Sequence, residues 1–171
     1  MPDTFIITYL HMTDRAQFKP AYIIDPGMAI KRLEQPTVPF YRFLYDSVGD
    51  QLRWRDRRLM TDEELHAAIT DPAVSIYVLY VDDEPAGYVE LHRLGMDTEI
   101  EYFGLIPGNM GRGLGKHLLS FGIEQAWNDG AERVLVDTCN LDSLQALPNY
   151  LKRGFEVYDV QSKPMPDRYK T

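Results

Sequence analysis

The sequence predicts a mixed α/β fold built on a mixed sheet, and two patterns carry this prediction. Residues 75–92 have the pattern of a strand, an acidic turn and a second strand, as in an antiparallel hairpin. Residues 98–160 follow the order strand, helix, strand, helix, strand, which is typical of α/β proteins. We expect residues 1–171 to form one domain, because a chain of 171 residues buries a core without disulfides or a structural metal.

The first 74 residues predict one strand, a long loop and two helices. Residues 4–10 are rich in β-branched and aromatic side chains and predict a strand. Residues 11–39 carry four prolines and little periodicity, so we expect a loop with a short helical turn. Apolar residues recur at helical spacing over residues 40–49. Thr61-Asp-Glu-Glu has the pattern of a capping box, which predicts a second helix over 61–69.

The second half predicts alternating strands and helices with clear stop signals. Pro107-Gly108 ends a strand, and Asn128-Asp-Gly ends the long helix, as a glycine beyond a helix C-terminus does. Pro148 lacks a backbone N–H, so we expect the last helix to begin near it. The expected elements are strands 75–81, 86–92 and 98–106, helix 114–127, strand 133–138, a helix within 144–153 that begins near Pro148, and strand 155–160.

Composition and charge exclude several classes of partner. The net charge of −8 argues against nucleic acid, which needs clustered Lys and Arg. No window approaches the roughly 18 apolar residues of a membrane span, and no basic and apolar leader opens the chain. Cys139 is the single cysteine, and its place after a buried strand favours an inert thiol over a nucleophile. We therefore expect a cytoplasmic protein. The four histidines show no metal-ligand spacing, so no metal site is expected.

A glycine-rich loop, Met110-Gly-Arg-Gly-Leu-Gly-Lys, lies between an expected strand and the start of a helix. Glycines let the backbone approach a ligand closely, and a helix N-terminus offers free N–H groups to an anion such as pyrophosphate. A Walker loop does not fit, because Met110 and His117 stand at two of its defining positions. The Rossmann fingerprint fails at Lys116. A glycine-rich turn without a ligand is the remaining alternative.

Two elements of the sequence resemble those of the GNAT acetyltransferase superfamily. The family's Gln/Arg-x-x-Gly-x-Gly/Ala motif is matched by Gly113 and Gly115, with Met110 in place of the first residue. Its Ala-x-x-x-Tyr-x-x-x-Gly-Phe element is matched by residues 146–155. The resemblance covers residues 75 to about 160, and both elements stand in the family's order and separation.

This resemblance implies a mostly antiparallel sheet that splays between its fourth and fifth strands. It implies that residues 1–74 form the acceptor side, residues 75–160 the acetyl-CoA-binding core and residues 161–171 a tail. Tyr150 would protonate the departing thiolate, and Asn140 could replace a family asparagine at whose position Ser143 stands. The residues implied to bind acetyl-CoA are Leu105 and Ile106 along the pantetheine arm, Gly111, Arg112, Gly113, Leu114, Gly115 and Lys116 at the pyrophosphate, and Asn140 and Tyr150.

Three glutamates are candidates for the base that frees an amine for attack, with water as a further possibility. Glu99 and Glu101 alternate along one strand and so share a face, where Phe103 would keep them dry. Glu99 stands where some family members have the base, and Glu90 lies on the neighbouring strand. The competing interpretation is that these are solvated strand residues and that Tyr150 is a core tyrosine.

Together these features predict an acetyl-CoA-dependent N-acetyltransferase that needs no metal and transfers directly, in a ternary complex, to a primary amine of a small molecule or peptide. The acidity favours a cationic acceptor such as a polyamine or lysine. Tyr41, Tyr45 and Trp54 serve packing or, as the resemblance implies for this region, the acceptor site. A non-catalytic acyl-CoA-binding domain and an unrelated nucleotide-binding module are the alternatives. A homodimer is a further expectation, because the segment after Val160 is short for a seventh strand.

Overall fold

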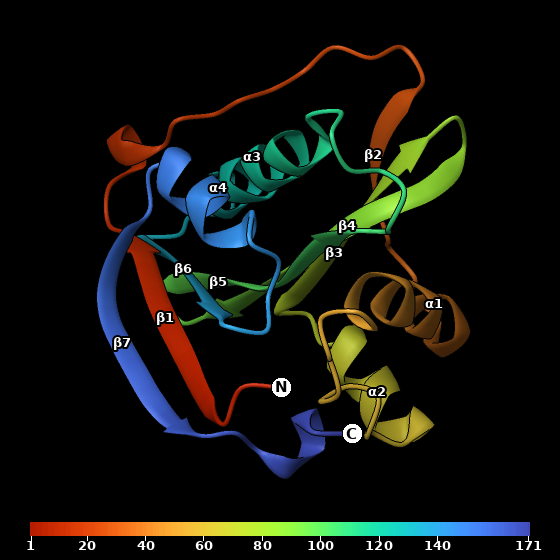
Figure 1. Ribbon diagram of the computed structural model, residues 1–171. Coiled ribbons are helices and arrows are strands. Elements are labelled where there is room, and N and C mark those ends of the chain that lie inside the picture. The colour runs from red at the N-terminus through yellow and green to blue at the C-terminus, as the bar shows by residue number, and fades with distance from the viewer.

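A single seven-stranded sheet organises the computed structural model, which describes residues 1–171 (Figure 1). Its strand order is β2-β3-β4-β5-β6-β1-β7, and only the β5–β6 pair is parallel. The mixed, mostly antiparallel sheet that was predicted is therefore confirmed. The strands are β1 Thr4–Met12, β2 Met28–Arg32, β3 Val74–Val81, β4 Glu84–Leu94, β5 Asp97–Leu105, β6 Arg133–Cys139 and β7 Glu156–Pro164. The helices are α1 Val38–Gly49, α2 Asp62–Ile69, α3 Leu114–Asn128 and α4 Ala146–Lys152, with 3₁₀ turns at Arg15–Gln17 and Asp167–Tyr169.

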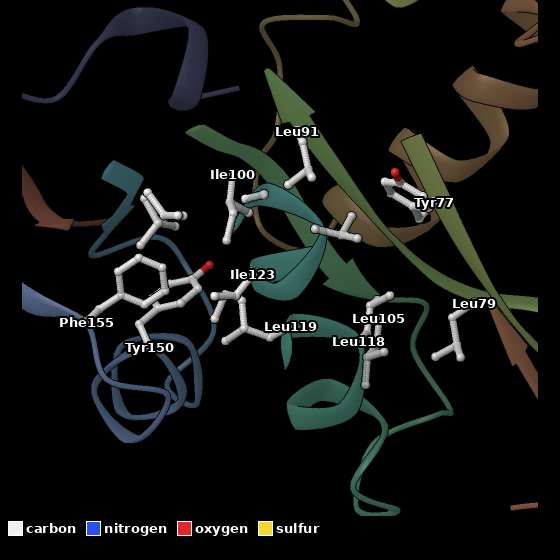
Figure 2. Packing of buried hydrophobic residues seen from close by; sticks show 14 of the residues in the cluster. Tyr77, Leu79, Leu91, Ile100, Leu105, Leu118, Leu119, Ile123, Tyr150 and Phe155 are labelled. Carbon is white, nitrogen blue, oxygen red and sulfur yellow. The ribbon is translucent and has the colours of Figure 1, made fainter. Parts of the chain in front are cut away.

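Helices cover both faces of the sheet and create two hydrophobic cores. The α3 stripe predicted from the sequence packs on β4, β5 and β6, where Leu118, Leu119 and Ile123 meet Leu91 and Ile100 (Figure 2). The other face carries α1 and α2, whose apolar side chains bury against β3 and β4. Burial of this kind supplies most of the driving force for the fold and fixes the strands that surround the site.

The sheet opens between β5 and β6, as the family resemblance implies. These are the fourth and fifth of the strands expected from the sequence, because β2 was not among them. These strands pair only between Asp97–Ile100 and Arg133–Val136, although β5 continues to Leu105 and β6 to Cys139. A β-bulge in β5 accompanies the opening, because Tyr102 pairs with Glu90 whereas Ile100 pairs with Leu91. Glu101 is therefore an extra residue, and such a bulge bends the strand and re-aims its side chains.

Several predicted boundaries need correction. The segment 11–39 is not all loop, since β1 runs to Met12 and the short edge strand β2 pairs with β3. Thr37 caps α1, which begins two residues earlier than expected, and the capping box of Thr61 is confirmed. The helix α4 begins at Ala146 rather than near Pro148. Pro148 is tolerated because first-turn N–H groups have no partner inside a helix.

The C-terminal strand also differs from the prediction. β7 extends to Pro164 and pairs along β1, which is inserted between β6 and β7. The chain thus supplies all seven strands of the sheet, contrary to the expectation that the segment after Val160 is too short for a seventh strand, and no partner strand is needed to complete it. A homodimer remains an untested expectation. None of the helices is long and apolar enough to cross a membrane.

Candidate active site

The glycine loop presents a run of free backbone N–H groups. None of the amides from Met110 to Lys116 donates a hydrogen bond within the chain. Gly111 and Gly113 have positive φ angles of 81° and 77°, and Gly113 is the N-cap of α3 without any side-chain cap. Unpaired amides and the positive end of the helix dipole together favour an anion. The loop can therefore hold a pyrophosphate.

The two basic residues of this loop, Arg112 and Lys116, differ in whether an acidic side chain pairs with them. The Arg112 guanidinium pairs with Asp25 at 3.2 Å, so its charge is partly offset. Lys116 has no acidic partner, and its stem lies 3.1 Å from where a Cβ on Gly113 would stand. A side chain at Gly113 would also meet Ile23 at 3.2 Å, whereas one at Gly115 would meet nothing closer than 3.7 Å. Gly111 and Gly113 thus both have backbone angles that favour glycine, and at Gly113 the neighbouring side chains also leave little room for a Cβ.

Two cavities lie on either side of Tyr150. One of about 110 Å³ lies beside the glycine loop and is lined by Leu105, Gly115 and Asn149 among others. The second, of about 350 Å³, lies where β5 and β6 part and includes Glu99 and carboxylates of β6. Four residues line both cavities: Leu52, Phe103, Asp142 and Tyr150. A group bound in the first cavity can therefore meet one bound in the second at Tyr150.

The Tyr150 ring is held firmly while its hydroxyl is left without a partner in the chain. The ring packs against Phe103 at 6.2 Å and edge-on to Phe155 at 6.1 Å, between centroids, and Figure 2 shows it beside Phe155. Burial, followed by the nearby carboxylates of Asp142 and Asp137, raises the pKa of Tyr150 well above its usual value. The phenol is therefore protonated at neutral pH and able to donate.

Glu99 has the surroundings of a general base. Its carboxylate is half-buried in the larger cavity and has no cationic partner. Burial, then Asp137 and Glu101, raises the pKa of Glu99 to about 7. A carboxylate with this pKa accepts a proton near neutral pH far more readily than an ordinary glutamate.

A family model described as the acetyltransferase (GNAT) family matches residues 40–155. The chain belongs to the GNAT family. No curated protein matches it.

Solved structures with the same fold support this assignment. A GCN5-related N-acetyltransferase from Sphaerobacter thermophilus superposes with a TM-score of 0.70 at 16% identity, over 95% of this chain and 52% of that one. An enzyme of the same description from Kribbella flavida gives a TM-score of 0.64 at 13% identity, over 92% and 56%. An aminoglycoside acetyltransferase from an uncultured soil sample gives 0.64 at 18%, over 77% and 90%. At these identities the likeness shows the fold, and the chain spans 56% to 62% of the length of three such structures.

In this GNAT chain the other two candidate bases, Glu90 and Glu101, form an ion-pair network with Arg57. Glu90 is completely buried, accepts a hydrogen bond from the Tyr41 hydroxyl at 2.6 Å and pairs with Arg57 at 2.8 Å. Glu101 lies 3.4 Å from Arg57 and 3.4 Å from His92. Of the three candidates, Glu99 alone faces the cavity without a cation beside it.

The bulge also corrects the expected arrangement of β5. Strict alternation would put Phe103 on the same face as Glu99 and Glu101. Glu101 and Tyr102 instead both contact Arg57 on the α1 side, so Phe103 turns to the α3 side and packs on Tyr150. Phe103 still lines the larger cavity because the two strands part there.

The remaining predicted cofactor residues are only partly brought together. Leu105 lines the smaller cavity, and the edge of β5 that faces β6 is unpaired beyond Ile100, through Leu105. Ile106 lines neither cavity, and its backbone is already bonded, because its N–H donates to the Ala86 carbonyl at 2.8 Å and its carbonyl accepts from Asn109. Asn140 lies elsewhere, because its amide bridges to Thr4 and Ile6 of β1 at 2.8 and 3.0 Å. Asn149 was not predicted as a site residue, yet it lines the smaller cavity and adjoins Tyr150 in the motif.

Aromatic residues of the first half have divided roles. Tyr45 and Trp54 line the larger cavity and contact each other at 5.3 Å between ring centroids. Tyr41 is completely buried and acts within the Glu90 network rather than at the cavity. The aromatic residues of the first half thus serve both as core packing and as one wall of the larger cavity. No cluster of three or more His, Cys, Asp or Glu side chains is placed to hold a metal.

Proposed function

We propose that this chain transfers an acetyl group from acetyl-CoA to a primary amine, directly and within a ternary complex. The single observation that carries the proposal is the position of Tyr150. It lines both the cavity beside the free amides of the glycine loop and the carboxylate-lined cavity between the parted strands. A thioester on one side and an amine on the other would meet beside a phenol that can donate a proton.

The residues present fit acetyl-CoA. The unpaired amides from Gly111 to Lys116 are suited to its pyrophosphate, and the free edge of β5 that ends at Leu105 is suited to the amide groups of its pantetheine arm. Bound there, acetyl-CoA supplies an activated acyl group as its thioester. Membership of an acetyltransferase family supports the same assignment.

The roles of the protein side chains follow from their protonation states. Glu99 takes a proton from the substrate ammonium, directly or through water, and so frees the nitrogen lone pair. As the new C–N bond forms and the C–S bond breaks, Tyr150 donates its proton to the departing sulfur. No covalent bond to the protein forms. The second proton of the attacking nitrogen, which the new C–N bond makes acidic, passes through water to restore the Tyr150 phenol, and the proton held by Glu99 returns to solvent.

The first test is calorimetric titration with acetyl-CoA, with ATP and NAD as controls. We expect acetyl-CoA alone to bind, and Gly113→Val to weaken it about tenfold or more, which is about 1.4 kcal/mol. Valine is strained at a φ of 77° and would push on Lys116 and Ile23. Gly130→Val is the matched control, because Gly130 also has a positive φ, of 96°, but follows the far end of α3.

Absence of acetyl-CoA binding by folded wild-type protein would overturn the proposal at its base. If the two valine variants weakened acetyl-CoA binding equally, the result would mean that acetyl-CoA does not bind at the glycine loop. Binding without thiol release from any amine would favour a non-catalytic acyl-CoA-binding domain instead.

The pH profile tests Glu99. Because burial raises its pKa to about 7, the carboxylate form is gained as pH rises through 7, and kcat/KM should rise with it. Glu99→Gln should lower kcat/KM by about 10²-fold and remove this limb, leaving only the slope due to the amine itself. Steady-state rates from pH 5.5 to 9 with one fixed acceptor provide the measurement. An unchanged profile in the variant would assign proton removal to water or another group.

A further inference from the structure

The larger cavity carries opposite charges at its two ends. The end next to Tyr150 holds the carboxylates of Glu99, Asp137 and Asp142, and none of them pairs with a cation. The other end is lined by Arg53, Arg55, Lys163 and Arg168. Charges that face a shared cavity without neutralising one another act on whatever enters it.

The separation of the two ends can be estimated along β1. Tyr9 lies opposite Asp137 of β6, whereas Phe5 lies opposite Lys163 of β7. Both Tyr9 and Phe5 line the cavity. They are four residues apart, which is about 13 Å at roughly 3.3 Å per residue. Side chains occupy part of this span, so groups that contact the two ends lie several bonds apart.

Two of the four cations at the basic end remain available. Arg168 is neutralised by Asp56 at 2.7 Å, and Arg55 donates to the carbonyl oxygens of Trp54 and Thr171. Arg53 gives one hydrogen bond to the Tyr169 carbonyl, and the Lys163 ammonium stands 5.6 Å from the centroid of the Phe5 ring. Neither Arg53 nor Lys163 has a carboxylate partner.

The C-terminal segment completes this end of the cavity. After β7 the chain turns back, and Figure 1 places its end beside the loop that follows α1. Tyr169 packs on Phe5 at 5.3 Å between ring centroids and accepts the Arg53 hydrogen bond at its carbonyl. The segment therefore holds Arg53 in the cavity wall.

We propose that the acceptor is an aminocarboxylate, with its ammonium at Glu99, Asp137 and Asp142 and its carboxylate at Arg53 and Lys163. This inference rests on the proposed acetyl transfer. An ω-amino acid or a short peptide has this chemistry. A polyamine has the right charge for the first end and the wrong one for the second, where like charges repel. The net charge of the chain favours polyamines, but the local charges reverse that preference.

The test is a matched series of acceptors assayed by thiol release at saturating acetyl-CoA. The series comprises 6-aminohexanoate, hexylamine and 1,6-diaminohexane, with a dipeptide to separate free amino acids from peptides. We expect kcat/KM for one of the two aminocarboxylates to exceed the values for hexylamine and the diamine by at least about tenfold, the effect of one charge-assisted hydrogen bond.

Charge reversal at Lys163 makes the test specific. Lys163→Glu should abolish the advantage of the aminocarboxylate and favour the diamine. Lys31→Glu is the control, because Lys31 is also an exposed lysine on an edge strand, with its ammonium 5.4 Å from the centroid of the Tyr80 ring, but it lines neither cavity. The control should leave the ranking of acceptors unchanged.

The possible failures are distinguishable. Turnover of hexylamine or the diamine as fast as of both aminocarboxylates, or equal effects of the two charge reversals, would overturn this inference and leave acetyl transfer standing. Acetyl-CoA binding with no turnover of any amine would overturn the proposed function, and this inference with it.

Discussion

Tyr150→Phe is expected to lower kcat by about 10²- to 10⁴-fold, the range for loss of a general acid, while acetyl-CoA binds almost as in the wild type. The phenylalanine ring keeps the contacts with Phe103 and Phe155 that fix the wall between the cavities. Only the proton donor is lost. Single-turnover thiol release, together with calorimetric binding of acetyl-CoA, separates the chemical step from affinity.

Folding provides the control for this result. The Tyr150 hydroxyl has no partner in the chain, so its removal should not lower the thermal midpoint. Tyr88→Phe is the matched variant, because Tyr88 is completely buried with an unpartnered hydroxyl but lies on the α1 side and lines neither cavity. Full activity in both variants would make Tyr150 a core tyrosine and assign the proton to water.

The second half of the fold could be predicted because its signals are local. The apolar stripe of α3, the glycine after it and the hairpin of β3 and β4 depend on residues close together in sequence. The glycine loop could be predicted for the same reason, since its glycines and the following helix are adjacent in sequence. The seven free amides from Met110 to Lys116 lie at the N-terminal end of α3 and its preceding loop, within one short stretch of sequence.

What escaped prediction depends on contacts between distant segments. β2 has five partly or fully exposed residues at a sheet edge and becomes a strand only by pairing with β3. The insertion of β1 between β6 and β7 joins the two ends of the sequence, and no periodicity encodes such a pairing. The bulge at Glu101 broke the rule of alternation on which the position of Phe103 was predicted.

The charges of the site escaped prediction for a related reason. Sequence identifies glutamates and arginines but not which of them pair. Glu90 was a reasonable candidate base until Arg57, 33 residues away in sequence, was found against it. Asn140 looked suited to a cofactor until its amide was found on β1. In both cases the folded partner, rather than the residue type, decides the role.

Arg57→Met is expected to lower the free energy of unfolding by about 3–5 kcal/mol, because it leaves buried carboxylates without their counter-ion. Glu90 is completely buried and Glu101 is partly exposed, and both pair with this guanidinium, which also lies over the Tyr102 ring. Urea denaturation measures the loss. Arg58→Met is the matched control, because Arg58 pairs only with the more exposed Asp46 and Asp50 and should cost about 0–1 kcal/mol.

The dependence of this loss on pH distinguishes an unpaired charge from a simple cavity. In the wild type, burial outweighs Arg57 and raises the pKa of Glu90 to about 7, above its value in the unfolded chain. A raised pKa stabilises the fold at low pH, and that contribution is lost as pH rises through 7. Removing Arg57 raises the pKa of Glu90 further, so the loss should be larger at pH 8.5 than at pH 6. Adding Glu90→Gln to Arg57→Met should abolish most of this difference, because no titrating carboxyl then remains at that position. A loss that is the same at both pH values would mean that Arg57 acts through packing alone.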